Sequence, residues 1–348
     1  MKHLILTGAC YIDTLLDVPC FPKEDDKLRA TGARVRRGGN CPNSIEVLQQ
    51  LLNRQRQETA GDGDDALFTT HLISVLPARD ATATAMIAQS FGTLPWVASP
   101  NLDLCLYRPR HSTPASSYIF RSAATGSRTI VNHYGLPEME VREFGDAASL
   151  FFAGYRMSAA DSSLWHFEGR MSATTLACMK YLRAQQYVRY GTEKKITISV
   201  EVEKPGREGL RDLAAVADIV FYSKSWAEEE GYASAEHCLC VESDNLSEGA
   251  LSFCTWGAEG AAAALSRRSG GSVVNCLAPH VPAASVVDTV GAGDTFVAGV
   301  LYQLVTNKAI QEPNGEWTAK EDTMRDVLAF AVNLATRKVQ IDGFQGLV

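Results

Sequence analysis

A glycine-rich segment that leads directly into a helical pattern carries the strongest chemical signal in the sequence. It reads Asp288-Thr-Val-Gly-Ala-Gly-Asp-Thr-Phe296, and the apolar helical pattern continues to Val305. Free N–H groups and the positive dipole end at a helix start bind anions. If this segment were only a structural anion site, the carboxylate of Asp294 would repel the bound phosphate. In a catalytic site, Asp294 could take a proton from an attacking hydroxyl while the amides of Gly291–Gly293 hold the phosphate charge. The alternative is a glycine-capped helix with an acidic first turn.

A second motif, Arg37-Gly-Gly-Asn-Cys-Pro-Asn43, opens an expected helix over 42–52. Its two glycines allow the backbone to approach a ligand closely. Asn40 and Asn43 each offer a donor and an acceptor, which suits the hydroxyl groups of a polyol. The alternative is that Asn40 is a plain helix N-cap.

Charge and hydropathy narrow the range of partners. The 348 residues include 33 basic and 40 acidic side chains, for a formal charge of -7, and no basic cluster stands out beyond 34–37. This distribution argues against nucleic acid and against an anionic membrane as partners. No apolar run approaches the ~20 residues that span a bilayer. We expect a cytoplasmic protein.

The nine cysteines are scattered along the chain, and no secretory signal pattern precedes them. They should therefore be reduced thiols. Cys238 and Cys240 form the only close pair, and a zinc site there would need two more soft ligands at suitable spacing. The sequence alone assigns no metal ligand.

Short β-prone apolar runs alternate with helical patterns, which predicts an α/β fold with a central, mostly parallel sheet flanked by helices. We expect strands at 4–6, 68–76, 117–120, 129–132, 165–168, 196–202, 219–222 and 251–255. We expect helices at 42–52, 81–91, 173–190, 226–230, 292–305 and 323–339.

Further β-prone stretches lie within about 9–37 and 103–133 and predict a small sheet separate from the main one. Polar or mixed composition at 53–66, 145–163 and 308–320 indicates three surface insertions. No linker divides the chain, so we expect a single domain over 1–348.

These motifs resemble those of the PfkB, or ribokinase-like, family of carbohydrate kinases, with the greatest similarity to its ketohexokinase (fructokinase) members. The resemblance rests on RGGNCPNS (37–44), SRTIV (127–131), LWHFEGR (164–170), ISVEVEKP (198–205), FYSKSWA (221–227), CTWGAEGAAAL (254–265), VVDTVGAGDTF (286–296) and GFQGLV (343–348). It implies a ribokinase-like three-layer fold whose small β-sheet acts as a lid, and a homodimer. It also implies a kinase that uses ATP and Mg²⁺ to phosphorylate a sugar hydroxyl, converting D-fructose to fructose 1-phosphate. A kinase for ribose, 2-keto-3-deoxygluconate or a nucleoside, and a non-catalytic sugar sensor on the same fold, stay open as alternatives.

The resemblance also implies roles for matching positions. Asp294 would be the catalytic base beside Gly291, Ala292 and Gly293, and the sugar would contact Asp13, Gly39, Asn40, Asn43 and Asp294. The nucleotide would contact Arg128, Lys224, Gly257, Ala258, Glu259, Gly260 and the 291–293 turn.

One group of charged residues could serve either of two roles. Glu168, Arg170, Glu201, Glu203 and Lys224 would face the same cleft, either orienting phosphates and magnesium or forming a structural ion-pair network. The sequence also departs from the family, because Ser223-Lys-Ser-Trp226 stands where many members have an Asn-x-x-Glu motif. The magnesium ligands are therefore unassigned.

Overall fold

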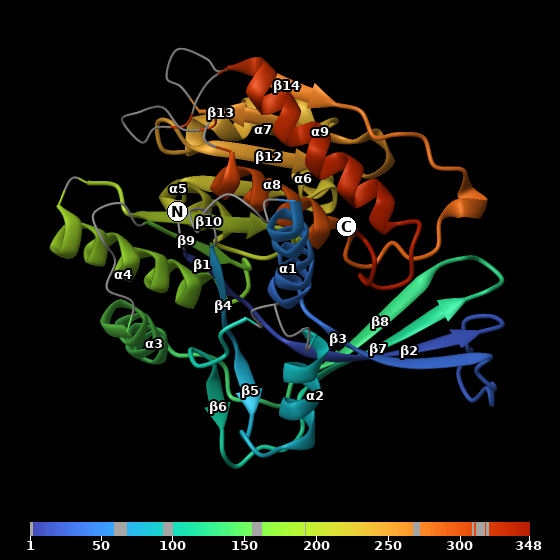
Figure 1. Cartoon of the computed structure of the whole chain (residues 1–348). Helices are drawn as coiled ribbons and strands as arrows, with labels where there is room; N and C mark the ends of the chain where they lie inside the picture. The colour runs from blue at the N-terminus through green and yellow to red at the C-terminus, as the bar shows by residue number, and fades with distance from the viewer. Residues whose placement is uncertain are drawn as a thin grey trace.

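The structure, a computed structural model, describes residues 3–58, 68–92, 100–154, 162–191, 193–266, 272–307, 310, 317 and 320–348. Its centre is an eight-stranded sheet of order β14-β13-β12-β11-β10-β9-β1-β4 (Figure 1). The strands are β1 (His3–Thr7), β4 (Thr69–Ile73), β9 (Ser163–Phe167), β10 (Ile196–Val202), β11 (Ile219–Tyr222), β12 (Leu251–Thr255), β13 (Ala261–Leu265) and β14 (Val273–Cys276). Pairing is parallel from β4 to β12 and antiparallel at β13 and β14, so the predicted mostly parallel sheet is confirmed.

Strand β1 shows why the sheet lies between two layers of helices. Side chains alternate between the faces of a strand, and here both sets are apolar and buried. Leu4 and Leu6 enter one hydrophobic core, whereas Ile5 enters the other. A short, wholly apolar run of this kind is typical of a parallel strand covered on both faces.

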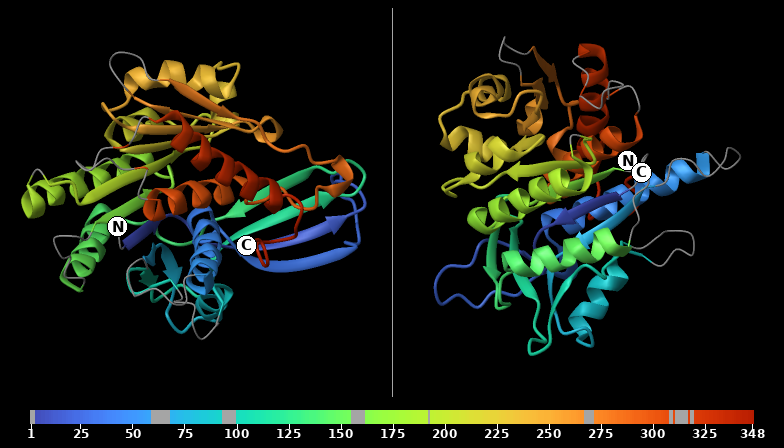
Figure 2. Two further views of the ribbon diagram at one scale, coloured as in Figure 1. Left: turned by 45° about the horizontal axis from the view of Figure 1, so that its top comes forward. Right: turned by 90° about the vertical axis from the view of Figure 1, so that its left-hand side faces the viewer.

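Helices cover both faces of the sheet, which completes the three layers (Figures 1 and 2). One core contains buried residues of α1, α8 and α9, and the other contains residues of α3, α4, α5, α6 and α7. The described helices are α1 (Asn40–Glu58), α2 (Thr82–Ser90), α3 (Val141–Gly154), α4 (Ser172–Tyr190), α5 (Leu210–Val216), α6 (Lys224–Glu229), α7 (Ala235–Glu242), α8 (Ala292–Thr306) and α9 (Glu321–Lys338). The arrangement is the predicted ribokinase-like fold.

A separate four-stranded sheet projects from the main body (Figure 1). Its order is β3-β2-β7-β8, and its strands are β2 (Tyr11–Val18), β3 (Gly32–Gly38), β7 (Ala115–Ser122) and β8 (Arg128–His133). We call it the lid sheet. Paired residues point to the same face of a sheet. Asp13 therefore shares one face with Arg36 and Ser117, while Val35, Tyr118 and Val131 lie on the other.

Several sequence-based expectations differ from the structure. The run 68–76 is two strands, because β4 joins the main sheet and β5 (Val75–Pro77) pairs with β6 (Leu106–Arg108) in a third sheet. Residues 106–108 are therefore not part of the lid sheet. The segment 145–163 was wrongly interpreted as an insertion, since 145–154 form most of α3 and include the buried Phe151 and Phe152.

The other two expected insertions lie mostly outside the described residues. Of 53–66, residues 53–58 continue α1, and of 308–320 only 310, 317 and 320 are described. Within the described part of the chain, no helix is both long enough and apolar enough to cross a membrane.

Candidate active site

The turn that leads into α8 is shaped by a glycine and a distant aromatic ring. Gly291 has a φ of 84°, a left-handed conformation that favours glycine. A Cβ atom there would also lie 2.3 Å from the ring of Phe344, so the ring requires a residue without a side chain. The first N–H groups of a helix have no partner within the helix. The turn therefore presents the Gly293 amide at a helix start that can bind an anion, while the Ala292 amide donates a 3.4 Å hydrogen bond to the carbonyl of Thr289.

Asp294, in the first turn of α8, is tied to the start of α1. Asn43 donates a 2.7 Å hydrogen bond from Nδ2 to Oδ2 of Asp294. Arg37 in turn donates from a guanidinium nitrogen to Oδ1 of Asn43 at 3.0 Å, which fixes the orientation of the Asn43 amide. Ser44 Oγ donates to the backbone carbonyl of Asp294 at 3.0 Å. One carboxylate oxygen is thus held, and the other is left for a ligand.

The bend before α1 needs glycine as strictly as the turn before α8. Gly39 has a φ of 106°, and a Cβ atom would lie 2.1 Å from the carbonyl oxygen of Ala9. This close approach places Asn40 at the start of the helix. Asn40 Nδ2 donates to Glu201 Oε2 at 2.7 Å and to Glu203 Oε2 at 2.8 Å.

Behind Asn40, a buried hydrogen-bond chain continues into the sheet. His166 Nε2 lies 2.9 Å from Glu201 Oε1, and His166 Nδ1 contacts Ser199 Oγ. Burial lowers the pKa of His166 to about 3, so its ring is neutral and the contact with Glu201 is a hydrogen bond and not an ion pair. Neighbouring strands β9 and β10 therefore fix the orientation of Asn40.

Carboxylates crowd this region, and their pKa values rise. Burial, reinforced by neighbouring carboxylates, raises the pKa of Glu168 to about 7 and that of Glu201 to about 8. Desolvation and the charge of Glu201 raise the pKa of Asp294 well above its ordinary value, although the Asn43 hydrogen bond opposes the shift. A carboxylate with a raised pKa is a stronger base than an ordinary one.

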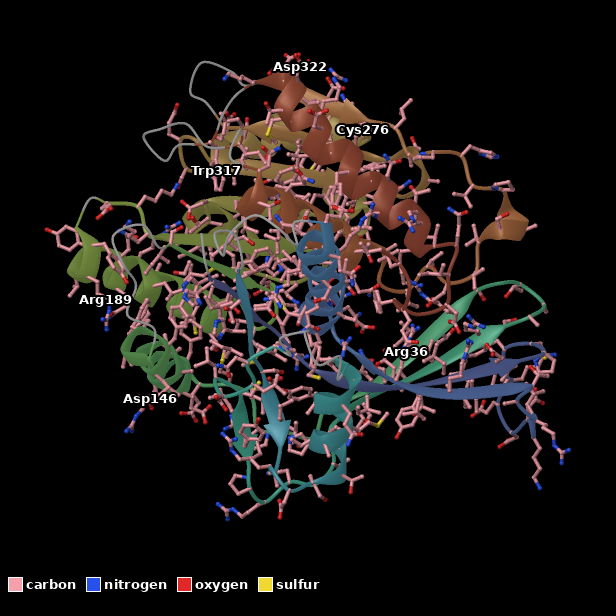
Figure 3. All side chains as sticks on the ribbon, in the orientation of Figure 1. Arg36, Asp146, Arg189, Cys276, Trp317 and Asp322 are labelled. Atoms are coloured by element: carbon pink, nitrogen blue, oxygen red, sulfur yellow. The ribbon has the colours of Figure 1, made fainter. Side chains whose placement is uncertain are left out.

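The lid sheet contacts the turn before α8. Arg36 of β3, labelled in Figure 3, forms a 3.0 Å ion pair with Asp288, whose side chain is 2% exposed. Lys338 of α9 contacts the same carboxylate at 3.3 Å. Although burial opposes it, a hydrogen bond from the Val290 amide and the charges of Arg36 and Lys338 hold the pKa of Asp288 below its ordinary value. Asp288 therefore anchors both the turn and the lid sheet.

Two predicted ligands lie on the lid sheet itself. Asp13 is buried at the inner face, where desolvation raises its pKa although a hydrogen bond from Ser117 opposes the shift. Arg128 is exposed and donates a 2.7 Å hydrogen bond to Oγ1 of Thr289 in the turn. The structure thus brings Arg128 to the turn before α8.

A cavity of about 560 Å³ lies beside this turn. Its volume is within the ~300–1,000 Å³ range of small-molecule sites. The predicted nucleotide residues Gly257, Ala258, Gly260, Ala292 and Gly293 line it. Most of the remaining wall is apolar, which suits the flat faces of a nucleobase. This wall includes Ala278, Pro279, Val281, Val286, Phe296, Val332, Ala335 and Val339.

Lys224 and Glu259 stand beside the 257–260 loop. Their side chains approach to 3.5 Å, and Lys224 Nζ lies 5.2 Å from the centre of the Trp256 ring. Glu259 is exposed, and neither residue belongs to the lining of the 560 Å³ cavity. Lys224 and Glu259 thus form a surface ion pair beside the loop whose Gly257, Ala258 and Gly260 line the cavity.

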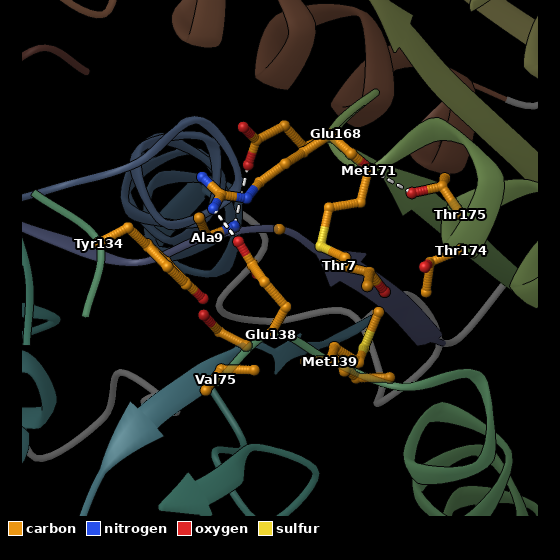
Figure 4. A pocket seen from close by; sticks show the side chains of 14 residues that line it. Thr7, Ala9, Val75, Tyr134, Glu138, Met139, Glu168, Met171, Thr174 and Thr175 are labelled. Carbon is orange, nitrogen blue, oxygen red and sulfur yellow. Dashed lines mark hydrogen bonds and ion pairs between the residues drawn. The ribbon is translucent and has the colours of Figure 1, made fainter. Parts of the chain in front are cut away.

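Arg170 lies near Glu168 but pairs with a different carboxylate. It forms an ion pair with Glu138 and a hydrogen bond with Tyr11 Oη. It lines a second, small cavity of about 50 Å³, whose wall includes Glu168, Tyr134 and Glu138 (Figure 4). The hydroxyls of Thr7 and Ser74, which line the same cavity, make no protein hydrogen bond. The contacts of Arg170 with Glu138 and Tyr11 support a role in a structural ion-pair network and not in orienting phosphates.

Sequence reasoning missed much of the site. The cavity wall supplied by α9 gave no chemical signal, because its alanines and valines look like ordinary core residues. Asp288 and Lys338 are fifty positions apart in the chain, and no local pattern links them. By contrast, Asp294, Asn43 and Asn40 were all found from glycine-rich helix starts, and the structure brings them together.

Comparisons with known proteins agree with this geometry. A family profile described as "pfkB family carbohydrate kinase" matches residues 105–346. The chain is 28% identical over 350 residues to mouse (Mus musculus) ketohexokinase, and the match covers 100% of this chain and 99% of that protein. Solved structures of ribokinases are similar at lower identity. That of Giardia lamblia has a TM-score of 0.72 at 15% identity and covers 100% of this chain and 97% of its own. That of Arabidopsis thaliana, complexed with ribose and ATP, has a TM-score of 0.64 at 16% identity and covers 99% and 94%.

Proposed function

The chain belongs to the pfkB family of carbohydrate kinases and is an ATP-dependent sugar kinase, and from this premise we propose that its acceptor is a ketohexose, with D-fructose converted to fructose 1-phosphate. The full-length match to mouse ketohexokinase supports this acceptor over ribose. The single observation that carries the mechanism is the placement of Asp294, between the asparagines of α1 and the nucleotide-sized cavity.

We propose Asp294 as the general base. Asn43 occupies Oδ2, so Oδ1 can accept the proton of the attacking sugar hydroxyl. The raised pKa of Asp294 makes this transfer more favourable than it would be for an exposed aspartate. The hydroxyl oxygen would then attack the γ-phosphorus, and the bond to the bridging oxygen of ADP would break.

Backbone amides and the guanidinium of Arg128 on the lid sheet would stabilise the phosphate charge. The N–H group of Gly293 lies at a helix start, where it can hold the γ-phosphate, and that of Ala292 could join it by giving up its long 3.4 Å hydrogen bond to Thr289. Arg128 can pair with phosphate oxygens through its planar guanidinium. The adenine ring would occupy the apolar part of the 560 Å³ cavity.

On the sugar side, we assign Asp13, Gly39, Asn40 and Asn43 to the hydroxyl groups of the acceptor. Asp13 and Asn43 are buried polar side chains at the interface of the lid sheet and the main body. Buried polar groups that can pair with a ligand hydroxyl discriminate strongly against ligands that lack it.

Magnesium would reach the site with ATP, and it would reduce the negative charge of the phosphates. The described residues offer the carboxylate oxygens of Glu201 and Glu203 near Asp294, and the side chain of Glu203 is 30% exposed whereas that of Glu201 is 6% exposed. Mg²⁺ prefers such oxygen donors and usually retains several waters. We propose that Glu203 helps to hold this hydrated ion.

An ADP-release assay with fructose, tagatose, ribose, 2-keto-3-deoxygluconate and adenosine tests the acceptor. We expect the highest kcat/KM with fructose, and phosphorus NMR should locate the new ester on the C1 hydroxyl. Turnover with adenosine alone would overturn the sugar assignment. Sugar binding by calorimetry without turnover of any acceptor would instead favour a sensor.

A further inference from the structure

One cluster of potential metal ligands makes none of the proposed direct contacts with the sugar or ATP. Cys41, His166 and Glu201 come from three different elements, namely α1, β9 and β10. Their ligand atoms, a sulfur, a ring nitrogen and a carboxylate oxygen, all lie within 4.8 Å of one another. All three residues are buried, with exposures of 0%, 0% and 4%.

We propose that Cys41, His166 and Glu201 bind one zinc ion. Zinc bonds of about 2.0–2.3 Å in a tetrahedral site place neighbouring ligand atoms ~3.5 Å apart. The separation of up to 4.8 Å therefore closes through side-chain movements on the order of an ångström. A thiolate with an imidazole selects zinc over magnesium, which prefers oxygen ligands.

Groups around the cluster already orient its ligands. Ser199 contacts Nδ1 of His166, which directs Nε2 toward Glu201 at 2.9 Å. A serine hydroxyl can accept as well as donate, so Nδ1 can carry the ring proton once Nε2 binds a metal. Asn40 holds Oε2 of Glu201, and Oε1, which now lies 2.9 Å from His166 Nε2, would bind the ion together with that nitrogen. Such outer partners are typical of protein metal sites.

Glu168 lies beside Cys41 at the edge of the cluster. A Cβ atom at Gly8 would lie 2.7 Å from the Cys41 sulfur and 2.9 Å from the Glu168 carboxylate, so these two groups flank the same glycine. Glu168 or a water molecule would complete a four-coordinate site. The ion could enter past Asn40 and Glu203, which are both partly exposed.

Acidic side chains surround this position. Glu203 accepts a hydrogen bond from the same Asn40 amide group as Glu201, and Glu168 lies beside Cys41. The nearby basic side chains, Arg170 and Lys204, are paired with Glu138 and Glu203. On binding, the thiol of Cys41 would lose its proton to solvent, and the resulting thiolate and Glu201 would offset the charge of the ion.

The direct test is a cobalt titration of the chelator-treated protein. Co²⁺ substitutes for zinc, and a cobalt–thiolate bond gives a charge-transfer band in the near ultraviolet. Because Cys20 and Cys240 are exposed and could bind metal adventitiously, both are replaced by serine in every sample. We expect the band at one Co²⁺ per chain, and we expect one equivalent of Zn²⁺ to abolish it.

Cys41→Ala and His166→Gln should each weaken binding by more than about 100-fold, since a lost ligand exceeds the effect of a lost outer partner. Cys178→Ala, which removes another fully buried thiol, is the matched control and should retain the band. Cys41→Ala should also retain sugar-kinase turnover in a Mg²⁺ buffer free of zinc and cobalt, which shows that the variant folds. The absence of a stoichiometric band in the starting protein, or its persistence in Cys41→Ala, would overturn the proposal. The spectrum does not depend on turnover, so this result is independent of the proposed acceptor.

Discussion

Replacing Asp294 by asparagine separates its chemistry from its structural role. In the variant, the new amide can keep the contact with Asn43 by turning its oxygen toward Nδ2, which now lies 2.7 Å from Asp294 Oδ2. Its NH₂ group then occupies the position of Oδ1. That group can donate a hydrogen bond but cannot accept the proton of the sugar hydroxyl.

The expected loss follows from this exchange. General-base catalysis contributes about 10²–10⁴-fold, which corresponds to roughly 3–5 kcal/mol of activation free energy. We therefore expect kcat to fall by that factor. ATP affinity should stay level or rise, because one negative charge near Glu201 and the phosphates is removed. The melting temperature should not fall, since the shape and the Asn43 contact are preserved.

The assay combines kcat from coupled ADP release with a calorimetric ATP titration and a melting curve. Asp288→Asn is the matched control, because it alters a carboxylate six positions earlier that binds Arg36 and Lys338. Breaking that buried pair should lower stability by roughly 3–5 kcal/mol. Near-normal kcat in Asp294→Asn would refute the assignment of the base. Early melting of Asp294→Asn would show that the carboxylate mainly supports the turn.

Three further predictions follow from the same geometry. Arg128→Ala should raise the KM for ATP and lower kcat, with a smaller effect on the KM for sugar. Arg128→Lys should restore only part of this loss, because lysine lacks the planar guanidinium that can make two parallel hydrogen bonds. Wild-type kinetics in both variants would show that Arg128 is only a surface charge. As pH falls, kcat/KM for the sugar should decrease with a midpoint above the ordinary aspartate pKa of about 4, because the base must be ionised and its pKa is raised. A midpoint near pH 4 would contradict this. The outer face of the lid sheet exposes Val35, Tyr118 and Val131 side by side, so we expect this face to form the dimer contact. Val131→Asp should therefore sediment as a monomer. A wild-type protein that is monomeric at micromolar concentration would rule this out.

The sequence was most informative where local geometry and chemistry coincide. Gly39 and Gly291 both need positive φ, and each directly precedes a helix that carries a proposed site residue. Such positions are visible in a sequence because glycine has a specific conformational use there. The alternating strand and helix patterns likewise predicted the main sheet.

The sequence was least informative where pairing is non-local. Strands β13 and β14 were missed, since the alanine-rich 261–265 run has low β-propensity and gains its structure by pairing with β12. Helix α3 was missed because its alanines, glycine and serine resemble a loop until the buried phenylalanines are seen against the sheet. The ion pair of Asp288 with Lys338 depends on the whole tertiary fold.

The contact of Phe344 with Gly291 has a consequence for the order of events during synthesis. The ring that shapes the turn before α8 belongs to a segment translated about fifty residues after the turn, and Lys338, which anchors Asp288, is also translated later. A nascent chain could thus complete the central parallel strands while the anion site still lacks its support. We expect ribosome-bound chains that end before residue 338 to be unable to form a competent site, so that activity would appear only when this segment emerges.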